Sequence, residues 1–484
     1  MVNHSEQKHF GIVYTPRPVV ELMLDKIESW DGVSVCDPSC GDGQFLVATA
    51  ERLCQKIHAG VDPHPYESTL QRLTGLDIDE QALNICRRRL NQVVEKAGCQ
   101  PVNWNLIRVD ALDRNKWTSL GPFDVVIGNP PYVRIQHLET RRRQRILEGN
   151  WSCMKGCADL YMLFFEMGLQ LVRSHGSLIY ITPSSWMNNS AGKPLRNLIR
   201  DHHGLVSITD FGGHQIFSHV TTYTAITHIK VKAPAINRAK GWACTGFTNG
   251  RPNLRRATIF KNQNGLRVMS HQDAVYLRRL TTRPKRLRDL ADIHVGIQTL
   301  ADDVFVLGEG NLDIEPGITR RIVKASVMKD GKDRARRRVI YPYNDGQLIP
   351  ESDLAGQYPK AYAYLMQHKQ QLLQRDKGSI DPAKWYGFGR DVSILSGFGE
   401  KILTSGMNAA PNFQKCSDPE SLFYSGYCVK PRPGVPIDVL LGELNGADMA
   451  RYIRLVSRPF RNGWFSYAKT YIQDFPLLEL CHAR

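Results

Sequence analysis

The chain has 484 residues, of which 42% are hydrophobic and 23% charged, and both fractions are ordinary for a globular protein. One hydrophobic core rarely organises a chain of this length, so two domains are expected. The net charge of +16 is unevenly divided, because residues 1–235 hold 25 Lys and Arg against 23 Asp and Glu, whereas residues 236–484 hold 38 against 24. This division indicates a nearly neutral body joined to a domain that binds a polyanion.

The cysteines and the hydropathy pattern indicate the cellular compartment of the protein. Eleven cysteines without regular spacing favour free thiols over a disulfide framework. Cys153 and Cys157 have a spacing found in metal sites, but no second pair lies close in the sequence, so no metal is expected. The first ten residues are polar and no apolar run approaches 18 residues, which argues against a secretion signal or a membrane span. We therefore expect a cytoplasmic protein.

The first predicted element is a helix, indicated by helical spacing over residues 19–27. Thr15 is the expected N-cap of this helix and Pro16 its first residue. With Tyr14 beside it, Thr15 would present a hydroxyl and backbone N–H groups that suit a carboxylate ligand. A capped surface helix explains the same residues equally well.

A strand over residues 33–37, a loop of small residues and a helix to about residue 57 follow. Gly41 and Gly43 allow a sharp turn and a close approach of a ligand to the backbone, with Cys40 beside them. A third glycine is missing, so this is not the dinucleotide-binding fingerprint. Asp37, at the end of the strand, could bind a cationic or hydroxyl-bearing ligand.

Two further strands are also predicted to end in carboxylates. Residues 73–79 precede a helix over residues 80–96, and Asp77 is placed to accept hydrogen bonds from a ribose diol, while Asp79 caps the helix. Residues 106–112 form a third unit that ends in Asp110, which could accept from an adenine amino group. An acid at the end of a strand is common in α/β proteins, but three in succession are harder to assign to chance.

The fourth predicted strand, Phe123–Ile127, leads into Gly128-Asn129-Pro130-Pro131-Tyr132. Two prolines stop the strand and leave a rigid corner. The amide oxygen of Asn129 and the carbonyl of Pro130 can each accept one N–H of a flat exocyclic amine, while Tyr132 stacks on its ring. Two acceptors outside the ring plane favour the geometry of an amine that attacks a methyl donor. All four strand ends would face one crevice of an open parallel sheet.

The remainder of the first half continues the alternation of helices and strands. Helices are predicted over residues 159–172 and 193–203, and strands over residues 176–183, 205–211 and 223–231. Phe217, in the loop before the last strand, is either a second stacking wall or a buried anchor of the loop. Arg141, Arg142, Arg143 and Arg145 would place positive charge beside the crevice, or form a solvated helical face.

The second half is less informative. Residues 237–288 are expected to contain a linker and a helix with basic clusters, and residues from about 295 onward a β-rich region. The basic run formed by Lys332, Arg334, Arg336, Arg337 and Arg338 is a candidate for phosphate contacts. Three segments, residues 385–390, 423–427 and 463–467, interleave aromatic residues with glycine. On physical grounds such aromatics are more often core residues than base contacts.

Together these motifs resemble the gamma-class, TaqI-like adenine-specific DNA methyltransferases of restriction-modification systems. The order of the motifs matches over residues 11–231: the Tyr14-Thr15-Pro16 segment, the loop after Asp37, Asp77, Asp110, Asn129 to Tyr132, and the Phe217 loop. The resemblance implies an α/β fold, a Rossmann-like class I methyltransferase with a mostly parallel seven-stranded sheet. It also implies a catalytic domain over residues 1–235 and a mixed, β-containing DNA-recognition domain over residues 236–484.

The resemblance further implies S-adenosylmethionine as the methyl donor and double-stranded DNA as the partner. Most of the cofactor-binding residues that the resemblance implies lie at or just after strand ends. The full set is Tyr14, Thr15, Asp37, Cys40, Gly41, Gly43, Asp77, Ile78, Asp110, Ala111 and Asn129. Relatives often carry a bulkier apolar residue where this chain has Ala111. The implied catalytic residues bind the target amine or stack on a flipped adenine: Asn129, Pro130, Tyr132 and Phe217. We also expect the protein to be a monomer that needs no metal. A cognate restriction endonuclease is a possible partner.

Three alternatives remain open from the sequence. The same tetrapeptide serves methylation of RNA and of a protein glutamine, although such enzymes usually lack a basic half of this size. A non-catalytic DNA-specificity subunit could keep the fold, although the intact Asn129, Tyr132, Asp77 and Asp110 speak against it. Methylation of the cytosine amino group shares the mechanism, but relatives with that activity generally carry Ser in place of Asn129.

Overall fold

The structure is a computed structural model that describes residues 14–59, 66–117, 119–154, 158–217, 222–232, 239–262, 265–308, 313–328, 331–333, 335–390, 394–457, 460 and 463–478. The chain forms two compact units, Met1–Ala274 and Val275–Arg484. The division therefore falls after residue 274 and not after residue 235 as expected. The reason is that three strands beyond residue 239 continue the sheet of the first unit.

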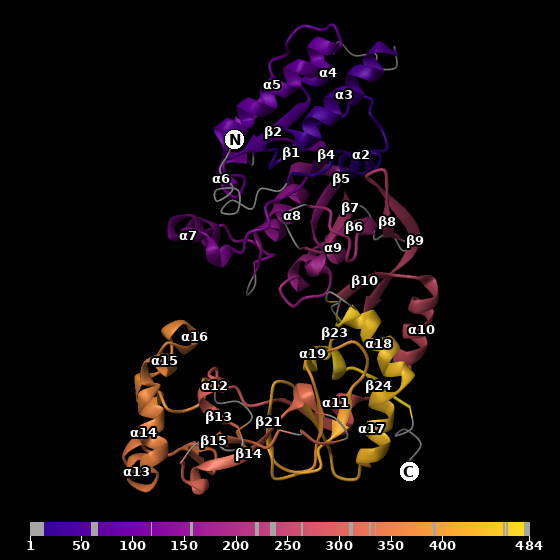
Figure 1. Ribbon diagram of the computed structural model, residues 1–484. Helices are drawn as coiled ribbons and strands as arrows, with labels where there is room; N and C mark the ends of the chain where they lie inside the picture. The colour runs from indigo at the N-terminus through magenta and orange to yellow at the C-terminus, as the bar shows by residue number, and fades with distance from the viewer. Residues whose placement is uncertain are drawn as a thin grey trace. The chain divides into compact units, whose positions relative to one another are not determined.

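The first unit is built on one ten-stranded sheet (Figure 1). In spatial order its strands are β10 (Gly265–Met269), β9 (Arg251–Asn262), β8 (Lys240–Thr248), β6 (His203–Asp210), β7 (Thr224–Val231), β5 (Val172–Pro183), β4 (Phe123–Gly128), β1 (Val35–Asp37), β2 (Leu73–Asp77) and β3 (Asn105–Arg108). Strands β1 to β6 are parallel to one another, and β7 is antiparallel to β5 and β6. This part is the seven-stranded sheet that the sequence predicts.

The three added strands correct the prediction of a linker and helix over residues 237–288. Strand β8 pairs in parallel with β6, and β9 and β10 follow as antiparallel hairpins. The expected helix does occur in this region, as α10 (His271–Thr281), and a short helix, α11 (Leu287–Leu290), begins at its end. Apolar residues such as Leu254, Ile259 and Val268 contact the core, which gives the three strands a reason to join the sheet.

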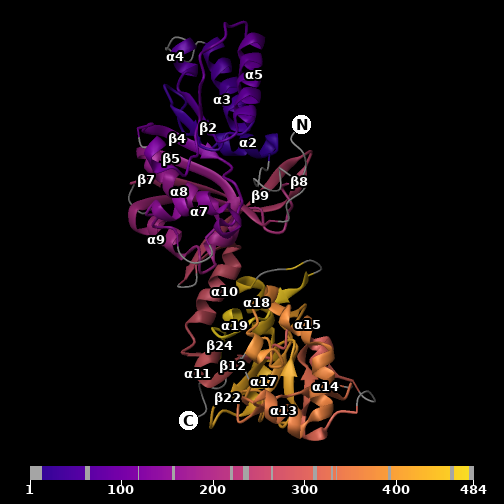
Figure 2. The ribbon, with the colours of Figure 1, turned by 90° about the vertical axis from the view of Figure 1, so that its left-hand side faces the viewer.

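Helices cover both faces of this sheet, as Figures 1 and 2 show. One face packs against α2 (Arg17–Leu24), α3 (Gln44–His58) and α5 (Glu80–Lys96), and the other against α6 (Arg114–Trp117), α7 (Thr140–Glu148), α8 (Leu160–Leu171) and α9 (Lys193–His202). The short helix α4 (Tyr66–Leu70) precedes β2. Successive residues of β4 face opposite sides of the sheet. Val126 packs on the side of α8, and Val125 and Ile127 pack on the side of α2, α3 and α5.

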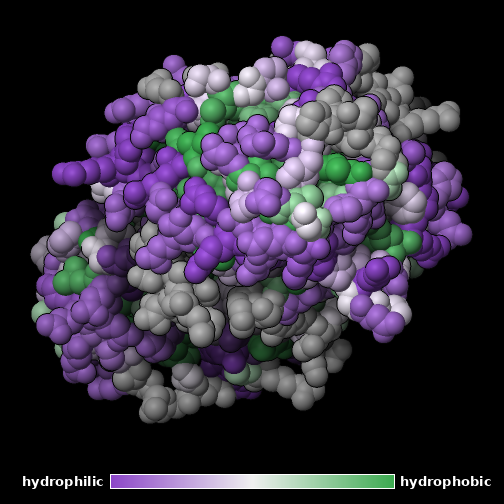
Figure 3. All heavy atoms as spheres, turned by 90° about the horizontal axis from the view of Figure 1, so that it is seen from above, coloured by the Kyte–Doolittle hydropathy of each residue, from purple (hydrophilic) through white to green (hydrophobic). Residues whose placement is uncertain are grey.

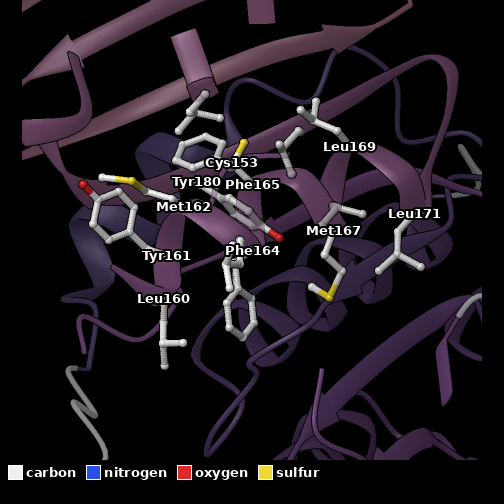
Figure 4. Close-up of a cluster of buried hydrophobic side chains, with 14 of the residues drawn as sticks. Cys153, Leu160, Tyr161, Met162, Phe164, Phe165, Met167, Leu169, Leu171 and Tyr180 are labelled. Atoms are coloured by element: carbon white, nitrogen blue, oxygen red, sulfur yellow. The ribbon is translucent and has the colours of Figure 1, made fainter. Parts of the chain in front are cut away.

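Helix α8 is buried almost all round. Eleven of its twelve residues are buried, including Glu166. Phe165 packs edge-on against Tyr180 of β5, with ring centroids 5.4 Å apart, within the apolar cluster drawn in Figure 4. Arg114 pairs with Glu166 at 2.9 Å, so the buried carboxylate is compensated. This packing fixes β5 next to β4, the strand that leads into the Asn-Pro-Pro-Tyr corner.

The second unit contains two four-stranded sheets and several helices. One sheet has the order β12 (Ala291–Val295), β22 (Tyr427–Pro431), β18 (Ile402–Thr404), β20 (Phe413–Lys415), and the other β13 (Val306–Leu307), β15 (Arg337–Ile340), β14 (Thr319–Lys324), β21 (Leu422–Tyr424). The longer helices are α13 (Glu351–Gln357), α14 (Pro359–Gln367), α17 (Ile437–Asn445) and α18 (Ala447–Val456). The mixed, β-containing C-terminal part that the sequence predicts is therefore confirmed.

The surface is polar over most of the face drawn in Figure 3, where apolar residues gather only in small patches among the coloured atoms. Among the described residues, no helix combines the length and the apolar composition needed to span a bilayer.

Candidate active site

The carboxyl ends of four neighbouring strands meet at one edge of the first unit's sheet. Strand β1 pairs in parallel with β4 through Cys36 and Val126, and with β2 through Asp37 and Gly75. Strand β2 pairs in parallel with β3 up to Asp77. Asp37 and Asp77 are the last residues of their strands, Asn129 directly follows β4, and Asp110 lies two residues after the end of β3. The structure thus brings the four side chains to the same edge, as the sequence predicts.

Asp37 is the most deeply buried of these groups, with 1% of its surface exposed. A Cβ atom at Gly128 would lie 2.6 Å from Asp37 Oδ1, so the carboxyl group lies directly over the end of β4. Burial, with a smaller contribution from the charge of Asp77, raises the pKa of Asp37 to about 8, although the Ser39 N–H that donates to Oδ1 at 3.1 Å opposes the shift. Asp37 is therefore mainly protonated at neutral pH, and a cationic ligand would favour its ionised form.

The loop between β1 and α3 is shaped by two glycines in the left-handed region. Gly43 has φ 90°, and a Cβ there would lie 2.5 Å from Cys86 Sγ, so only glycine fits. Gly41 has φ 54°, and a Cβ there would meet nothing within 4 Å, so this side of the loop is open. Cys40 is buried beneath the loop, and its carbonyl accepts from Gly43 N–H at 2.8 Å. A ligand can therefore approach the backbone of the loop closely at Gly41.

Asp77 ties this loop to the second strand. Its Oδ2 accepts from Gly41 N–H at 2.8 Å and its Oδ1 from Asp79 N–H at 2.9 Å, and burial raises its pKa. Each carboxylate oxygen has two lone pairs, so both oxygens keep one acceptor position for a diol. Asp79 caps α5 by accepting from Gln81 N–H at 2.8 Å, as predicted. Ile78, between them, is 42% exposed and gives an apolar surface beside the carboxylate.

The start of α2 differs from the prediction. The helix begins at Arg17, Pro16 occupies the N-cap position, and no side chain caps the helix. Thr15 is 4% exposed, and its hydroxyl has no hydrogen-bond partner among the described residues. Buried polar atoms nearly always have a partner, so this hydroxyl is a candidate ligand contact. Tyr14 is 46% exposed, and partial burial together with the charges of Asp42 and Asp79 raises its pKa.

Asp110 is held by an arginine that the sequence did not connect with it. Arg142 of α7 donates from Nε to Asp110 Oδ2 at 3.0 Å and from Nη2 to Oδ1 at 3.3 Å. Leu112 N–H also donates to Oδ1, at 3.1 Å. One acceptor position therefore remains on Oδ2, where an amino group could bind. Ala111 is buried next to it. Three neighbouring residues of α7 remain exposed, namely Arg141, Arg143 and Arg145.

The Asn-Pro-Pro-Tyr corner follows β4 directly. Asn129 is half-buried and Pro130 is buried, and no hydrogen bond to the Pro130 carbonyl occurs among the described residues. The Tyr132 hydroxyl donates to the Ile181 carbonyl of β5 at 3.4 Å. The corner is thus fixed against β5, with a carbonyl available to an external donor.

Phe217, which the sequence allows as a second stacking wall or as a buried anchor of its loop, lies beside Tyr132. The two ring centroids are 6.1 Å apart, and the rings are inclined at 64°. Phe217 is 3% exposed and belongs to the core that α2 and α3 form, so it also anchors its loop. A base that stacks on both rings requires one of them to turn, because rings at this angle present no parallel faces.

In the second unit, the basic run lines a hollow of about 870 Å³ together with residues of β14 and the loop before β21. Part of the run has internal partners, since Arg337 pairs with Asp333 and Arg338 Nε donates to Thr319 Oγ1 at 2.7 Å. Lys332 and Arg336 are exposed, while Arg334 lies outside the described residues. Some residues of the basic run therefore hold the second unit together, while others are exposed on its surface.

The aromatic segments of the second unit belong mainly to its core. Six aromatic side chains are at most 6% exposed, namely Trp385, Tyr386, Phe388, Phe423, Tyr424 and Tyr467. Trp464 is 44% exposed. The physical interpretation of these segments as core, favoured at the sequence level, is confirmed for the six. Of the proposed cysteine pair, Cys153 is buried and Cys157 lies outside the described residues; among those described, no group of three or more His, Cys, Asp or Glu could hold a metal ion.

Sequence reasoning missed two features of this edge. The contact between Arg142 and Asp110 joins residues 32 apart in the chain, and no local signal predicts it. The hairpin of β8 and β9 had a signal in Asn249-Gly250, a dipeptide typical of two-residue hairpin turns. Both residues have positive φ, 48° and 74°, and the flanking Thr248 and Arg251 pair.

Comparisons with known proteins agree with these motifs. The family described as Eco57I restriction-modification methylase matches residues 71–217. The type II methyltransferase M.BstVI of Geobacillus stearothermophilus is 28% identical over 429 residues, which cover 80% of this chain and 75% of that protein. The type II methyltransferase M.XhoI of Xanthomonas vasicola is 27% identical over 417 residues, which cover 78% and 74%.

Among solved structures, the type IIL restriction-modification enzyme MmeI in complex with DNA superposes with a TM-score of 0.64 at 14% identity, over 95% of this chain and 64% of that chain. This chain thus spans less than two thirds of the MmeI chain. The resemblance to restriction-modification DNA methyltransferases is confirmed by these matches. The fold class is confirmed as well, with ten strands in the sheet where seven were expected.

Proposed function

We propose that this chain methylates the exocyclic N6 amine of adenine in duplex DNA, with S-adenosylmethionine as the methyl donor, as the modification enzyme of a restriction-modification system. The observation that carries the proposal is the position of the Asn129–Tyr132 corner next to Asp37, at the edge where β2 and β3 deliver Asp77 and Asp110. The type II methyltransferases M.BstVI and M.XhoI, to which most of the chain is similar, support the same class of reaction.

The residues at this edge fit the cofactor. Asp77 keeps acceptor positions for the ribose hydroxyls, and Asp110 keeps one for the adenine amino group while Arg142 holds it in orientation. The Thr15 hydroxyl, the open side of Gly41 and the buried Asp37 suit the charged methionine end. When bound, S-adenosylmethionine supplies an electrophilic methyl group.

The target amine is activated by two acceptors. Asn129 Oδ1 and the Pro130 carbonyl accept its two N–H groups outside the ring plane, which directs the nitrogen lone pair toward the methyl group. A new N–C bond forms as the S–C bond breaks, and the nitrogen then loses one proton to solvent. Tyr132 stacks on the adenine. An amine within a duplex cannot reach this corner, so the target nucleotide leaves the helix, at a cost of a few kcal/mol.

The proposal assigns DNA binding to the second unit, Val275–Arg484, which is basic. The MmeI structure, whose fold is similar, is a complex with DNA. We further propose that the protein acts as a monomer in the cytoplasm and that a cognate restriction endonuclease accompanies it. The experiment that tests it incubates the purified chain with S-adenosylmethionine and with duplex DNA, RNA or a glutamine-containing protein. Mass spectrometry of the hydrolysed products should find N6-methyladenine in duplex DNA alone; methyl groups on cytosine, RNA or protein would contradict the proposal.

The raised pKa of Asp37 predicts a pH dependence of stability. An aspartate with a pKa of about 8 in the folded state and about 3.9 in the unfolded state binds more protons when folded between these values. Folding stability of the free protein should therefore fall as pH rises from about 4 to 8. Asp37→Asn should remove this contribution, so the melting temperature of the variant should fall less than that of the wild type over this range. Equal slopes for the two proteins would show that Asp37 is ionised in the free protein.

A further inference from the structure

Residues 211–272 contain no Asp or Glu. Nine residues of this stretch are basic, namely Lys230, Lys232, Arg238, Lys240, Arg251, Arg255, Arg256, Lys261 and Arg267. The stretch includes β7 and the three strands β8, β9 and β10 that extend the sheet. Lys230 pairs with Glu28 at 2.9 Å, but the stretch itself supplies no carboxylate to offset its cations, so the potential over this part of the first unit favours a polyanion.

The hairpin of β8 and β9 projects beyond the edge where the candidate active site lies. Strand β8 is parallel to β6, and their pairing ends at Asp210 and Ala243. Five further residues, 244–248, continue to the turn, where Thr248 pairs with Arg251. At about 3.3 Å per residue, the tip lies on the order of 15 Å past the end of β6.

The tip of this hairpin adjoins both sides of the site. A Cβ at Gly250 would lie 4.0 Å from Pro18 Cγ, three residues after Thr15. Phe247 contacts His214, in the segment that leads to Phe217, with ring centroids 6.0 Å apart. Figure 2 shows β8 and β9 beside α2. The hairpin therefore stands at the rim of the crevice that contains the Asn-Pro-Pro-Tyr corner.

One face of the hairpin is exposed and cationic. Arg251, Asn253 and Arg255 alternate along β9 and are exposed, whereas Leu254 between them contacts the core. Within the described part of the chain, neither Arg251 nor Arg255 pairs with a carboxylate. Phe247 at the tip is 40% exposed. Arg251 and Arg255 are four residues apart on β9, on the order of 13 Å along the strand. Their two guanidinium groups can therefore reach separate phosphates of one nucleic-acid backbone.

We propose that the exposed face of the β8–β9 hairpin, through Arg251 and Arg255, binds the phosphates of the DNA strand next to the target adenine. The inference rests on the proposed function, and it assigns a DNA contact to the first unit in addition to the basic second unit. Such a contact would hold the backbone on one side of the nucleotide that enters the crevice. It would add affinity without adding sequence preference, because phosphates carry no sequence information.

The test compares the wild-type chain with the double variant Arg251→Ala/Arg255→Ala and with Arg88→Ala. Arg88 is an exposed arginine in the middle of α5, away from the strand ends, and serves as the matched control. Binding to a duplex oligonucleotide is measured by fluorescence anisotropy from 50 to 200 mM salt, and S-adenosylmethionine binding by calorimetry. The melting temperature of each protein establishes that it is folded.

The double variant should bind duplex DNA about tenfold more weakly, with a salt slope reduced by roughly 1.8, since each phosphate contact contributes about 0.9. Its affinity for S-adenosylmethionine should equal that of the wild type, and Arg88→Ala should behave as wild type throughout. An unchanged DNA affinity and slope in the double variant would overturn the inference and assign the two arginines to protection of an open strand edge. Failure of the wild type itself to bind or methylate duplex DNA would instead refute the proposed function.

Discussion

Replacement of Asn129 by Ala is expected to lower the rate of methyl transfer by at least about 10²- to 10³-fold, while S-adenosylmethionine still binds. Loss of a single preorganised polar group that stabilises a transition state has effects on this order. Asn129 directly follows β4, and the corner is fixed by the two prolines and by the contact of Tyr132 with Ile181. The backbone that carries the amide is therefore held in place at the end of β4, and Ala offers no acceptor in place of the amide oxygen.

The measurement is transfer of a tritiated methyl group to duplex DNA, together with calorimetric binding of the cofactor. Asn84→Ala, which alters an exposed asparagine of α5, is the matched control and should keep full activity. A fully active Asn129→Ala protein would remove Asn129 from the mechanism. Loss of both activity and cofactor binding would show that the corner supports the cofactor site and not the target amine.

Replacement of Asp77 by Ala is expected to lower the affinity for S-adenosylmethionine by on the order of 10²-fold. Asp77 should hold two ribose hydroxyls, and each hydrogen bond to a charged group contributes about 1.5–3 kcal/mol. The same carboxylate fixes the glycine loop through Gly41 N–H at 2.8 Å. Its removal therefore takes away direct contacts and also loosens the loop that lies against the ligand.

The matched control is Asp79→Ala. Asp79 lies two residues away but caps α5, so its loss should cost about 1 kcal/mol of folding stability and leave cofactor affinity within about threefold. Calorimetry of S-adenosylmethionine binding and thermal unfolding of both variants separate the two roles. Equal losses of affinity in the two variants would contradict the assignment of the ribose contact to Asp77.

Much of the first unit could be predicted because its local signals agree with its tertiary contacts. Helix α5 begins and ends at the predicted residues, since Asp79 caps it and its apolar residues recur at helical spacing. The buried β-branched run of β4 ends where two prolines prohibit further pairing. Strand ends that carry acids then converge because parallel strands in one sheet share their carboxyl edge.

The features that escaped prediction depend on long-range contacts or on competing local preferences. Thr15 is a favourable capping residue, yet the structure buries it and begins α2 two residues later. The pairing of Arg142 with Asp110 depends on where α7 docks, which the basic sequence of α7 does not reveal. Strands β8 to β10 are rich in Gly, Asn and Arg, and apolar residues alternate only weakly along them. The sequence pattern therefore did not predict these strands, despite the hairpin signal of Asn249-Gly250.

Long-read sequencing of DNA from cells that express this chain tests the central claim most directly, because it reports the modified atom and its sequence context together. Cells that express the Asn129→Ala chain provide the background. The account predicts N6-methyladenine at one recurring sequence in the wild-type sample and its absence in the variant. Unmodified adenines throughout the wild-type sample, or modification at cytosine, would contradict it.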